Sequence, residues 1–129
     1  MEFVHVATRT MDLEQAIAFY EALGLRLDHK RELTKNKATL AFMAKPDGDF
    51  AIELVYNWGR DTPYEGGERF GHFAFEVDDI EAEYARLLAA GGTDVGRPPA
   101  PLQGEGHRIA FVADPDGNWV ELIERHVGA

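Results

Sequence analysis

An internal repeat restricts the fold of this chain more than any other feature of its sequence. The stretch FVHVATRTMDLEQAIAFYEALGLRL at residues 3–27 matches FGHFAFEVDDIEAEYARLLAAGGTDV at residues 70–95. The match aligns Phe3 with Phe70, His5 with His72, Asp12 with Asp79 and Gly24 with Gly91. A repeat of roughly sixty residues indicates one supersecondary unit present twice. We therefore expect a single domain over residues 1–129 made of two modules, at about 1–62 and 68–129.

A second pair of matching segments follows in the same order. Residues 40–54 read LAFMAKPDGDFAIEL and residues 109–122 read IAFVADPDGNWVEL, so each consists of two apolar runs joined by Pro-Asp-Gly. The second run of each segment carries one acid, Glu53 or Glu121. The offset of 68 positions between these glutamates agrees with the offset of 67 positions between the two matching histidines. The glutamates therefore belong to the same duplication.

Each module is expected to fold as a strand, a helix and three further strands. FVHVATRT and HFAFEV have the β-branched and aromatic residues of short strands. Pro-Asp-Gly predicts a tight turn between ATLAFMA and FAIELVY, and again between HRIAFVA and WVELIER. Asp12 and either Asp78 or Asp79 are the expected helix N-caps, with Gln15 placed as in a capping box. The predicted fold class is α+β, with two tandem βαβββ modules.

The composition excludes several classes of partner and site. The chain has 23 acidic and 13 basic residues, a net charge of −10 that disfavours nucleic acid and anionic membrane surfaces. Cysteine is absent, so any metal must bind to oxygen and nitrogen. The N-terminal MEFVHVATRT does not resemble a secretion signal, and no apolar run approaches the length of a membrane span. We expect a cytoplasmic protein with a small-molecule substrate.

The two glutamates would carry a desolvation cost, because a charged carboxylate in a half-buried strand loses its hydration. A shared cation would offset that cost. Histidine nitrogen and glutamate oxygen together suit a divalent first-row ion such as nickel, cobalt, iron, manganese or zinc. Taken singly, each histidine fits better as a hydrogen-bonded core residue, and each glutamate as an edge-strand residue facing water. Four residues at matching places of a repeat, His5, Glu53, His72 and Glu121, favour the metal site.

A paired βαβββ module with these histidines and glutamates resembles the vicinal oxygen chelate superfamily, which includes glyoxalases, bleomycin-resistance proteins and dioxygenases. ELVYNWG at 53–59, FGHFAFEV at 70–77 and DPDGNWVELIE at 114–124 are most similar to bacterial glyoxalase I, the lactoylglutathione lyase. The resemblance implies a glyoxalase-like sheet or barrel. It also implies isomerisation of the hemithioacetal of methylglyoxal and glutathione to lactoylglutathione, with glutathione as co-substrate.

The resemblance assigns roles to the four residues. His5, Glu53, His72 and Glu121 are the implied metal ligands, and the two glutamates are the implied catalytic residues. Glu121 is favoured as the base with Glu53 as its counterpart, although the sequence does not decide between them. Zinc forms of the family often carry Gln where His5 stands and contain longer insertions, so nickel or cobalt is favoured, with zinc, manganese and iron as alternatives. The family also implies a homodimer with sites at the subunit interface.

Substrate contacts are expected at the far end of the same strands. Residues four apart in a strand share a face, so Arg9 lies beyond His5 and Asn57 beyond Glu53. In the family, Arg and Asn at these positions contact the glutamyl end of glutathione. Arg69 is a further candidate anion contact. PLQGEGHR lacks the family's basic residue before the third strand of the second module, which leaves Arg108 or His107 to replace it.

Other functions remain compatible with a paired βαβββ fold. Methylmalonyl-CoA epimerase typically has Gln at the position of Glu53. Extradiol dioxygenases and fosfomycin transferases use two histidines and one glutamate, which would leave Glu53 without a role. A non-catalytic binding protein of the bleomycin-resistance kind needs no set of four ligands.

Overall fold

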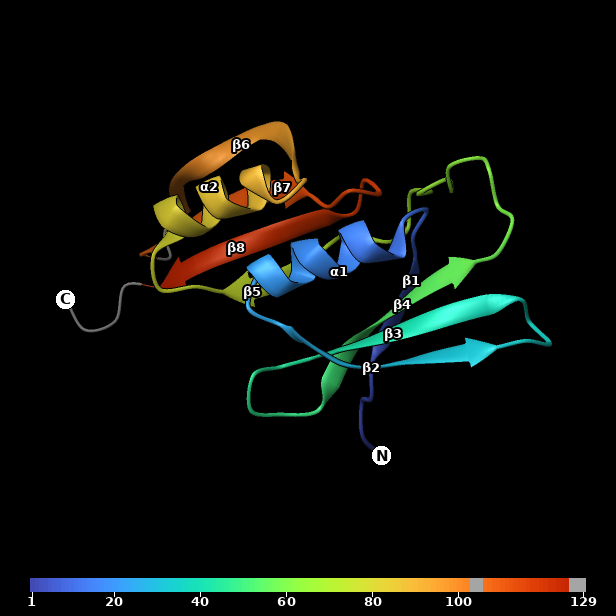
Figure 1. The fold of residues 1–129 in the computed structure, drawn as a ribbon. Helices are drawn as coiled ribbons and strands as arrows, with labels where there is room; N and C mark the ends of the chain where they lie inside the picture. The colour runs from blue at the N-terminus through green and yellow to red at the C-terminus, as the bar shows by residue number, and fades with distance from the viewer. Residues whose placement is uncertain (103–105, 126–129) are drawn as a thin grey trace. The chain divides into compact units, whose positions relative to one another are not determined.

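The computed structural model describes residues 1–102 and 106–125 and divides the chain into two compact units. Unit 1 comprises Met1–Glu65 and unit 2 comprises Gly66–Ala129 (Figure 1). Neither helix of the described part of the chain has the length and apolar character needed to cross a membrane.

Unit 1 is a four-stranded sheet with one helix. Its strand order is β1-β4-β3-β2, with β1 parallel to β4 and the other neighbours antiparallel. Its elements are β1 (Val6–Arg9), α1 (Leu13–Ala22), β2 (Arg26–Leu33), β3 (Ala38–Ala44) and β4 (Phe50–Asn57).

Unit 2 repeats this topology with the order β5-β8-β7-β6, in which β5 is parallel to β8. The two units confirm the predicted α+β fold of tandem βαβββ modules. Its elements are β5 (Phe73–Glu76), α2 (Ile80–Ala89), β6 (Thr93–Leu102), β7 (His107–Ala113) and β8 (Trp119–Arg125).

Both helices begin at a capping aspartate. The Asp12 carboxylate accepts a hydrogen bond from the Gln15 backbone N–H at 3.1 Å, and Asp79, not Asp78, caps α2. The expected capping box forms only in half. The Asp12 backbone N–H donates to the buried Thr10 hydroxyl at 3.2 Å, so this hydroxyl takes the place that the Gln15 side chain has in a capping box.

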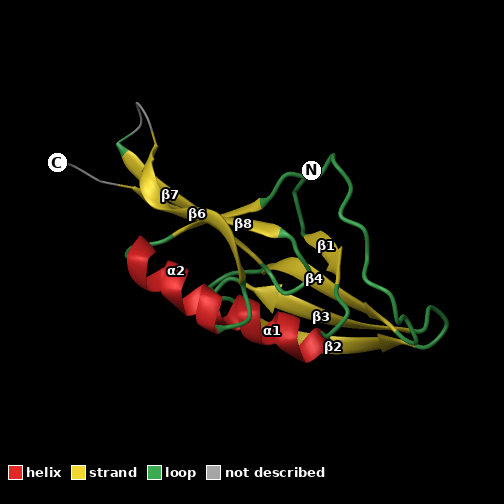
Figure 2. Ribbon diagram, turned by 90° about the horizontal axis from the view of Figure 1, so that it is seen from above, coloured by secondary structure: helices red, strands yellow, loops and turns green. Residues whose placement is uncertain are grey.

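Each sheet buries one face against its own helix (Figure 2). In β4, Ile52 and Leu54 are buried, and in β8, Val120 and Leu122 are buried. Because neighbouring side chains in a strand point to opposite faces, the intervening glutamates lie on the face away from the helix. Helix α1 contributes the apolar residues Leu13, Ala16, Ile17, Phe19 and Tyr20 to this packing.

Candidate active site

The first module brings His5 and Glu53 together. His5 precedes the first residue of β1, and Glu53 lies in β4, where it pairs in register with Ala7 of the parallel neighbour. The Nε2 atom of His5 lies 2.8 Å from Oε2 of Glu53. The two side chains are only 29% and 17% exposed, so the carboxylate is largely removed from water.

The second module builds the same pair from His72 and Glu121. Nε2 of His72 lies 2.9 Å from Oε1 of Glu121, which is in register with Ala74 of β5. The glutamate side chain is 16% exposed. Each histidine therefore lies one residue before its first strand, rather than within that strand as the sequence predicted. Glu53 and Glu121 occupy equivalent positions in the two modules, as the repeat predicts.

The donor atoms fit a divalent ion. Each pair presents one imidazole nitrogen and one carboxylate oxygen to the same point, the combination that first-row divalent metals accept. Each module supplies two of the four predicted ligands, and the described residues contain no cluster of three or more His, Cys, Asp or Glu side chains. The buried Nδ1 of His5 has no hydrogen-bond partner among the described residues, so its ring is held through Nε2.

Aromatic rings surround both pairs at equivalent positions. In module 1, Phe42 pairs in register with Glu53, and Phe50 lies 5.6 Å from the His5 ring. In module 2, the counterpart of Phe42 is Phe111, which pairs with Glu121 and lies 5.1 Å from the His72 ring. Trp119 replaces Phe50 and lies 5.4 Å from Phe111. The rings shield the carboxylates, which strengthens electrostatic interactions there.

The predicted substrate contacts of module 1 lie at the end of the sheet beyond the ligand pair. Arg9 pairs in register with Val55, and Asn57 ends β4 two residues later. Asn57 accepts a hydrogen bond at Oδ1 from the Tyr64 hydroxyl at 2.8 Å. The sequence alone did not predict this role for Tyr64. The only sequence signal was its position shortly after ELVYNWG, in a loop where no periodicity predicts a contact.

The matching positions of module 2 hold a different pair. Glu76 takes the place of Arg9, because it pairs with Ile123 as Arg9 pairs with Val55. Arg125 ends β8, and its Nη1 atom lies 2.9 Å from Oε1 of Glu76. These two charges neutralise each other, so the two modules differ at this end.

Of the other predicted basic contacts, Arg69 lies in the exposed segment that precedes β5. Arg108 faces the helix side of its sheet, where it forms ion pairs with Glu81 and, at 3.7 Å, with Glu124. The hydrogen bond with Glu81 is the main reason that the pKa of Arg108 is raised. Arg108 is therefore engaged away from the face that carries the His72 and Glu121 pair.

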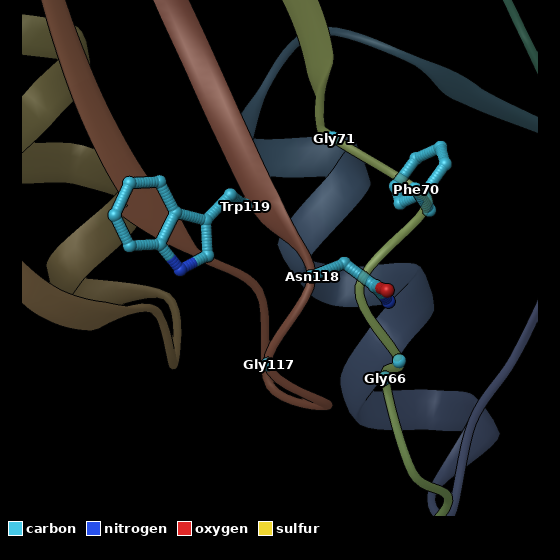
Figure 3. A pocket seen from close by; sticks show the side chains of 7 residues that line it. Gly66, Phe70, Gly71, Gly117, Asn118 and Trp119 are labelled. Atoms are coloured by element: carbon cyan, nitrogen blue, oxygen red, sulfur yellow. The ribbon is translucent and has the colours of Figure 1, made fainter.

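A pocket of the second module lies between the segment that precedes β5 and the turn that precedes β8 (Figure 3). Figure 3 shows Trp119 and Phe70 on opposite sides of Asn118. The Asn118 side chain donates to the Asp114 carboxylate at 3.0 Å, which fixes this turn. Phe70 and Trp119, both partly exposed, contribute aromatic rings to its wall. The pocket is lined by Gly66, Gly67, Phe70, Gly71, Gly117, Asn118 and Trp119.

The fold and the repeated pairs agree with known proteins. The family model of the Glyoxalase/Bleomycin resistance protein/Dioxygenase superfamily matches residues 2–122. The chain belongs to this superfamily. The family resemblance seen in the sequence is thereby confirmed.

Within the superfamily, the chain is similar to glyoxalase I proteins. The lactoylglutathione lyase of Haemophilus influenzae is 46% identical over 127 residues, which cover 96% of this chain and 93% of that relative. A probable chloroplastic lactoylglutathione lyase of Arabidopsis thaliana is 44% identical over 95% of this chain and 35% of the plant protein. The crystal structure of glyoxalase I from Zea mays has a TM-score of 0.86 and 38% identity, over 96% of this chain and 44% of that chain. The chain thus spans nearly all of the bacterial relative and less than half of the plant proteins.

Proposed function

We propose that this protein is a lactoylglutathione lyase, which converts the hemithioacetal of methylglyoxal and glutathione to lactoylglutathione. The observation that carries the proposal is the His–Glu contact that occurs at the same place in both modules, at 2.8 and 2.9 Å. Its support is the 46% identity to a bacterial lactoylglutathione lyase along almost the full length of both chains. Both glutamates then have a role, whereas the dioxygenase alternative leaves Glu53 without one and the epimerase typically has Gln at its position.

His5, Glu53, His72 and Glu121 would hold the metal ion. A four-ligand centre requires both pairs, since each module contributes one nitrogen and one oxygen donor. Bound there, a divalent ion would supply Lewis acidity to the oxygens of the substrate. We favour nickel or cobalt because histidine stands at position 5.

The chain's own carboxylates would move the proton. The reaction transfers a proton between two adjacent carbons. A single carboxylate can accept this proton from one carbon and return it to the other. We assign this role to Glu121 and the opposing position to Glu53. Both carboxylates are more than four-fifths shielded from water, so competing proton exchange with solvent is restricted.

Arg9 and Asn57 would bind the carboxylate at the glutamyl end of glutathione. Both lie beyond the ligand pair at the same end of the sheet. An Arg guanidinium and an amide donate hydrogen bonds that match a carboxylate. Arg69 is a further candidate contact, since its exposed segment leads into His72.

We further propose a homodimer in which His5 and Glu53 of one subunit share a metal with His72 and Glu121 of the partner subunit. Co-expression of a His5→Ala chain with a His72→Ala chain tests this arrangement. A shared site predicts that the mixed dimer regains one intact centre, about half of the wild-type metal content and activity. Sites built within one chain predict no recovery. The cytoplasmic location stays a prediction.

The function is tested by measuring the absorbance of lactoylglutathione formed from methylglyoxal and glutathione by the nickel-loaded protein. We expect turnover that is saturable in the hemithioacetal. Protein that holds its metal but shows no turnover would contradict the proposal and would favour a superfamily metalloenzyme that acts on another substrate.

A further inference from the structure

The chain that follows β4 folds back on the end of that strand. The Tyr64 hydroxyl donates to Oδ1 of Asn57 at 2.8 Å, and both side chains are half-buried. The loop between them is held by Arg60, whose guanidinium lies 4.1 Å from the centre of the Tyr64 ring. Arg60 also donates to the carbonyl oxygens of Thr62 and Pro63, at 2.7 and 3.1 Å. The Tyr64 ring and hydroxyl are thus both fixed.

This hydrogen bond sets the direction of the Asn57 amide. A carboxamide has an acceptor end and a donor end, and a half-turn about its last bond exchanges them. Because the Tyr64 hydroxyl donates to Oδ1 of Asn57, the oxygen end is occupied and the Nδ2 hydrogens point away from Tyr64. The free end of the amide is therefore the donor end.

Arg9 adds donors of the same kind. Its register with Val55 places it on the strand next to β4, on the face that also carries Glu53 and Asn57. The Arg9 side chain takes part in none of the hydrogen bonds or ion pairs found among residues 1–102 and 106–125. This end of module 1 thus presents N–H donors and positive charge, which suits an acceptor-only anion such as a carboxylate.

The equivalent end of module 2 is closed to such a ligand. Glu76 and Arg125 occupy the places of Arg9 and Asn57 and bind each other at 2.9 Å. A carboxylate would have to compete with Glu76 for Arg125. Module 1 can therefore accept a carboxylate at this end of its sheet. In module 2 the equivalent arginine is already paired with a carboxylate of the chain itself.

We infer that Tyr64 is a positioning residue for substrate specificity, and this inference rests on the proposed function. It holds the Asn57 amide with its Nδ2 hydrogens directed at the carboxylate of the thiol substrate that Arg9 also contacts. Tyr64 acts through Asn57 and takes no part in the proton transfer. Loss of the Tyr64 hydroxyl should therefore weaken substrate binding without slowing the conversion of the bound substrate.

The test is a double-mutant cycle on the nickel-loaded protein with Tyr64→Phe, Asn57→Ala and both together. Tyr64→Phe keeps the ring under Arg60 and removes only the hydroxyl. We expect KM for the hemithioacetal to rise roughly 3- to 10-fold with kcat and metal content unchanged. In the Asn57→Ala background the same substitution should change KM less than twofold. Tyr84→Phe is the matched control, because the Tyr84 hydroxyl binds Asp94 at 3.3 Å in the other module, and it should leave KM unchanged.

Two outcomes would overturn the inference. One is an unchanged KM in Tyr64→Phe, and the other is an equal rise in KM with and without Asn57. If Tyr64→Phe folds poorly, Asn57→Asp provides a second test, because it keeps an acceptor for Tyr64 but replaces the amide donor by a negative charge. Its KM should exceed that of the wild-type protein, and an unchanged value would show that the amide donor end of Asn57 does not bind the carboxylate. These outcomes can be told apart from failure of the proposed function. In that case the wild-type protein itself would show no turnover with methylglyoxal and glutathione.

Discussion

Nε2 of His72 lies 2.9 Å from Oε1 of Glu121, although 49 positions separate the two residues in the chain. His5 and Glu53 meet in the same way at 2.8 Å. A carboxylate this well shielded is stabilised by the hydrogen bond to its imidazole or by a cation that both side chains bind.

Removal of metal should abolish activity. Neutral imidazole and carboxylate donors bind divalent ions, and a chelator competes for the same ion. After dialysis against a chelator, added nickel or cobalt should restore more lactoylglutathione formation than added zinc. Full activity in the chelated protein, with metal absent by elemental analysis, would contradict a metal-dependent reaction.

Replacement of His72 by Ala should lower the metal content sharply. The substitution removes a neutral nitrogen donor, and His72 is the only histidine that contacts Glu121 among the described residues of this module. His29→Ala is the matched control, because His29 binds Asp28 on the outer strand β2 and should leave the metal in place. Stoichiometric metal in His72→Ala would mean that this histidine is no ligand.

Glu121→Gln should reduce kcat more than Glu53→Gln does. Glutamine keeps a neutral oxygen donor but cannot accept the proton, so loss of the base should lower kcat by roughly 10²- to 10⁴-fold. Metal content measured on the same samples separates the loss of a base from the loss of a ligand. A larger fall in Glu53→Gln would reverse the assignment of the two glutamates.

Arg9→Ala should raise KM for the hemithioacetal while metal content stays intact. The lost contact to a carboxylate is worth roughly 1.5–3 kcal/mol, or roughly 10- to 150-fold in KM. Arg125→Ala is the control from the other module, since Arg125 is already paired with Glu76, and its KM should stay within about twofold of wild type. Equal effects of the two substitutions would contradict the asymmetry between the modules.

Leu122→Ala should destabilise the fold. Leu122 is fully buried beside Glu121 on the helix-covered face of β8, so its truncation removes apolar contacts and leaves a cavity. The expected loss in the free energy of unfolding is roughly 2–5 kcal/mol, measured by urea denaturation. Leu102→Ala, at a side chain that is 39% exposed, should cost much less.

Much of the fold was predictable because its signals are local. The strands ATLAFMA, HRIAFVA and WVELIER have the bounds of β3, β7 and β8, and both helices begin at predicted aspartates. The strands β2 and β6 could not be delimited in the same way. Their sequences, RLDHKREL and TDVGRPPAPL, are mostly exposed and lack an alternating apolar pattern, so pairing with β3 and β7 is what makes them strands.

The sequence by itself determined the duplication, the order of elements and the four candidate ligands, since a repeat preserves equivalent positions whatever the fold. Only the tertiary structure decided which side chains meet. It placed Arg108 on the helix face, joined Glu76 to Arg125 and directed the Tyr64 hydroxyl to Asn57. These contacts depend on strand register and on the path of a loop, which long-range backbone pairing sets and no local pattern encodes.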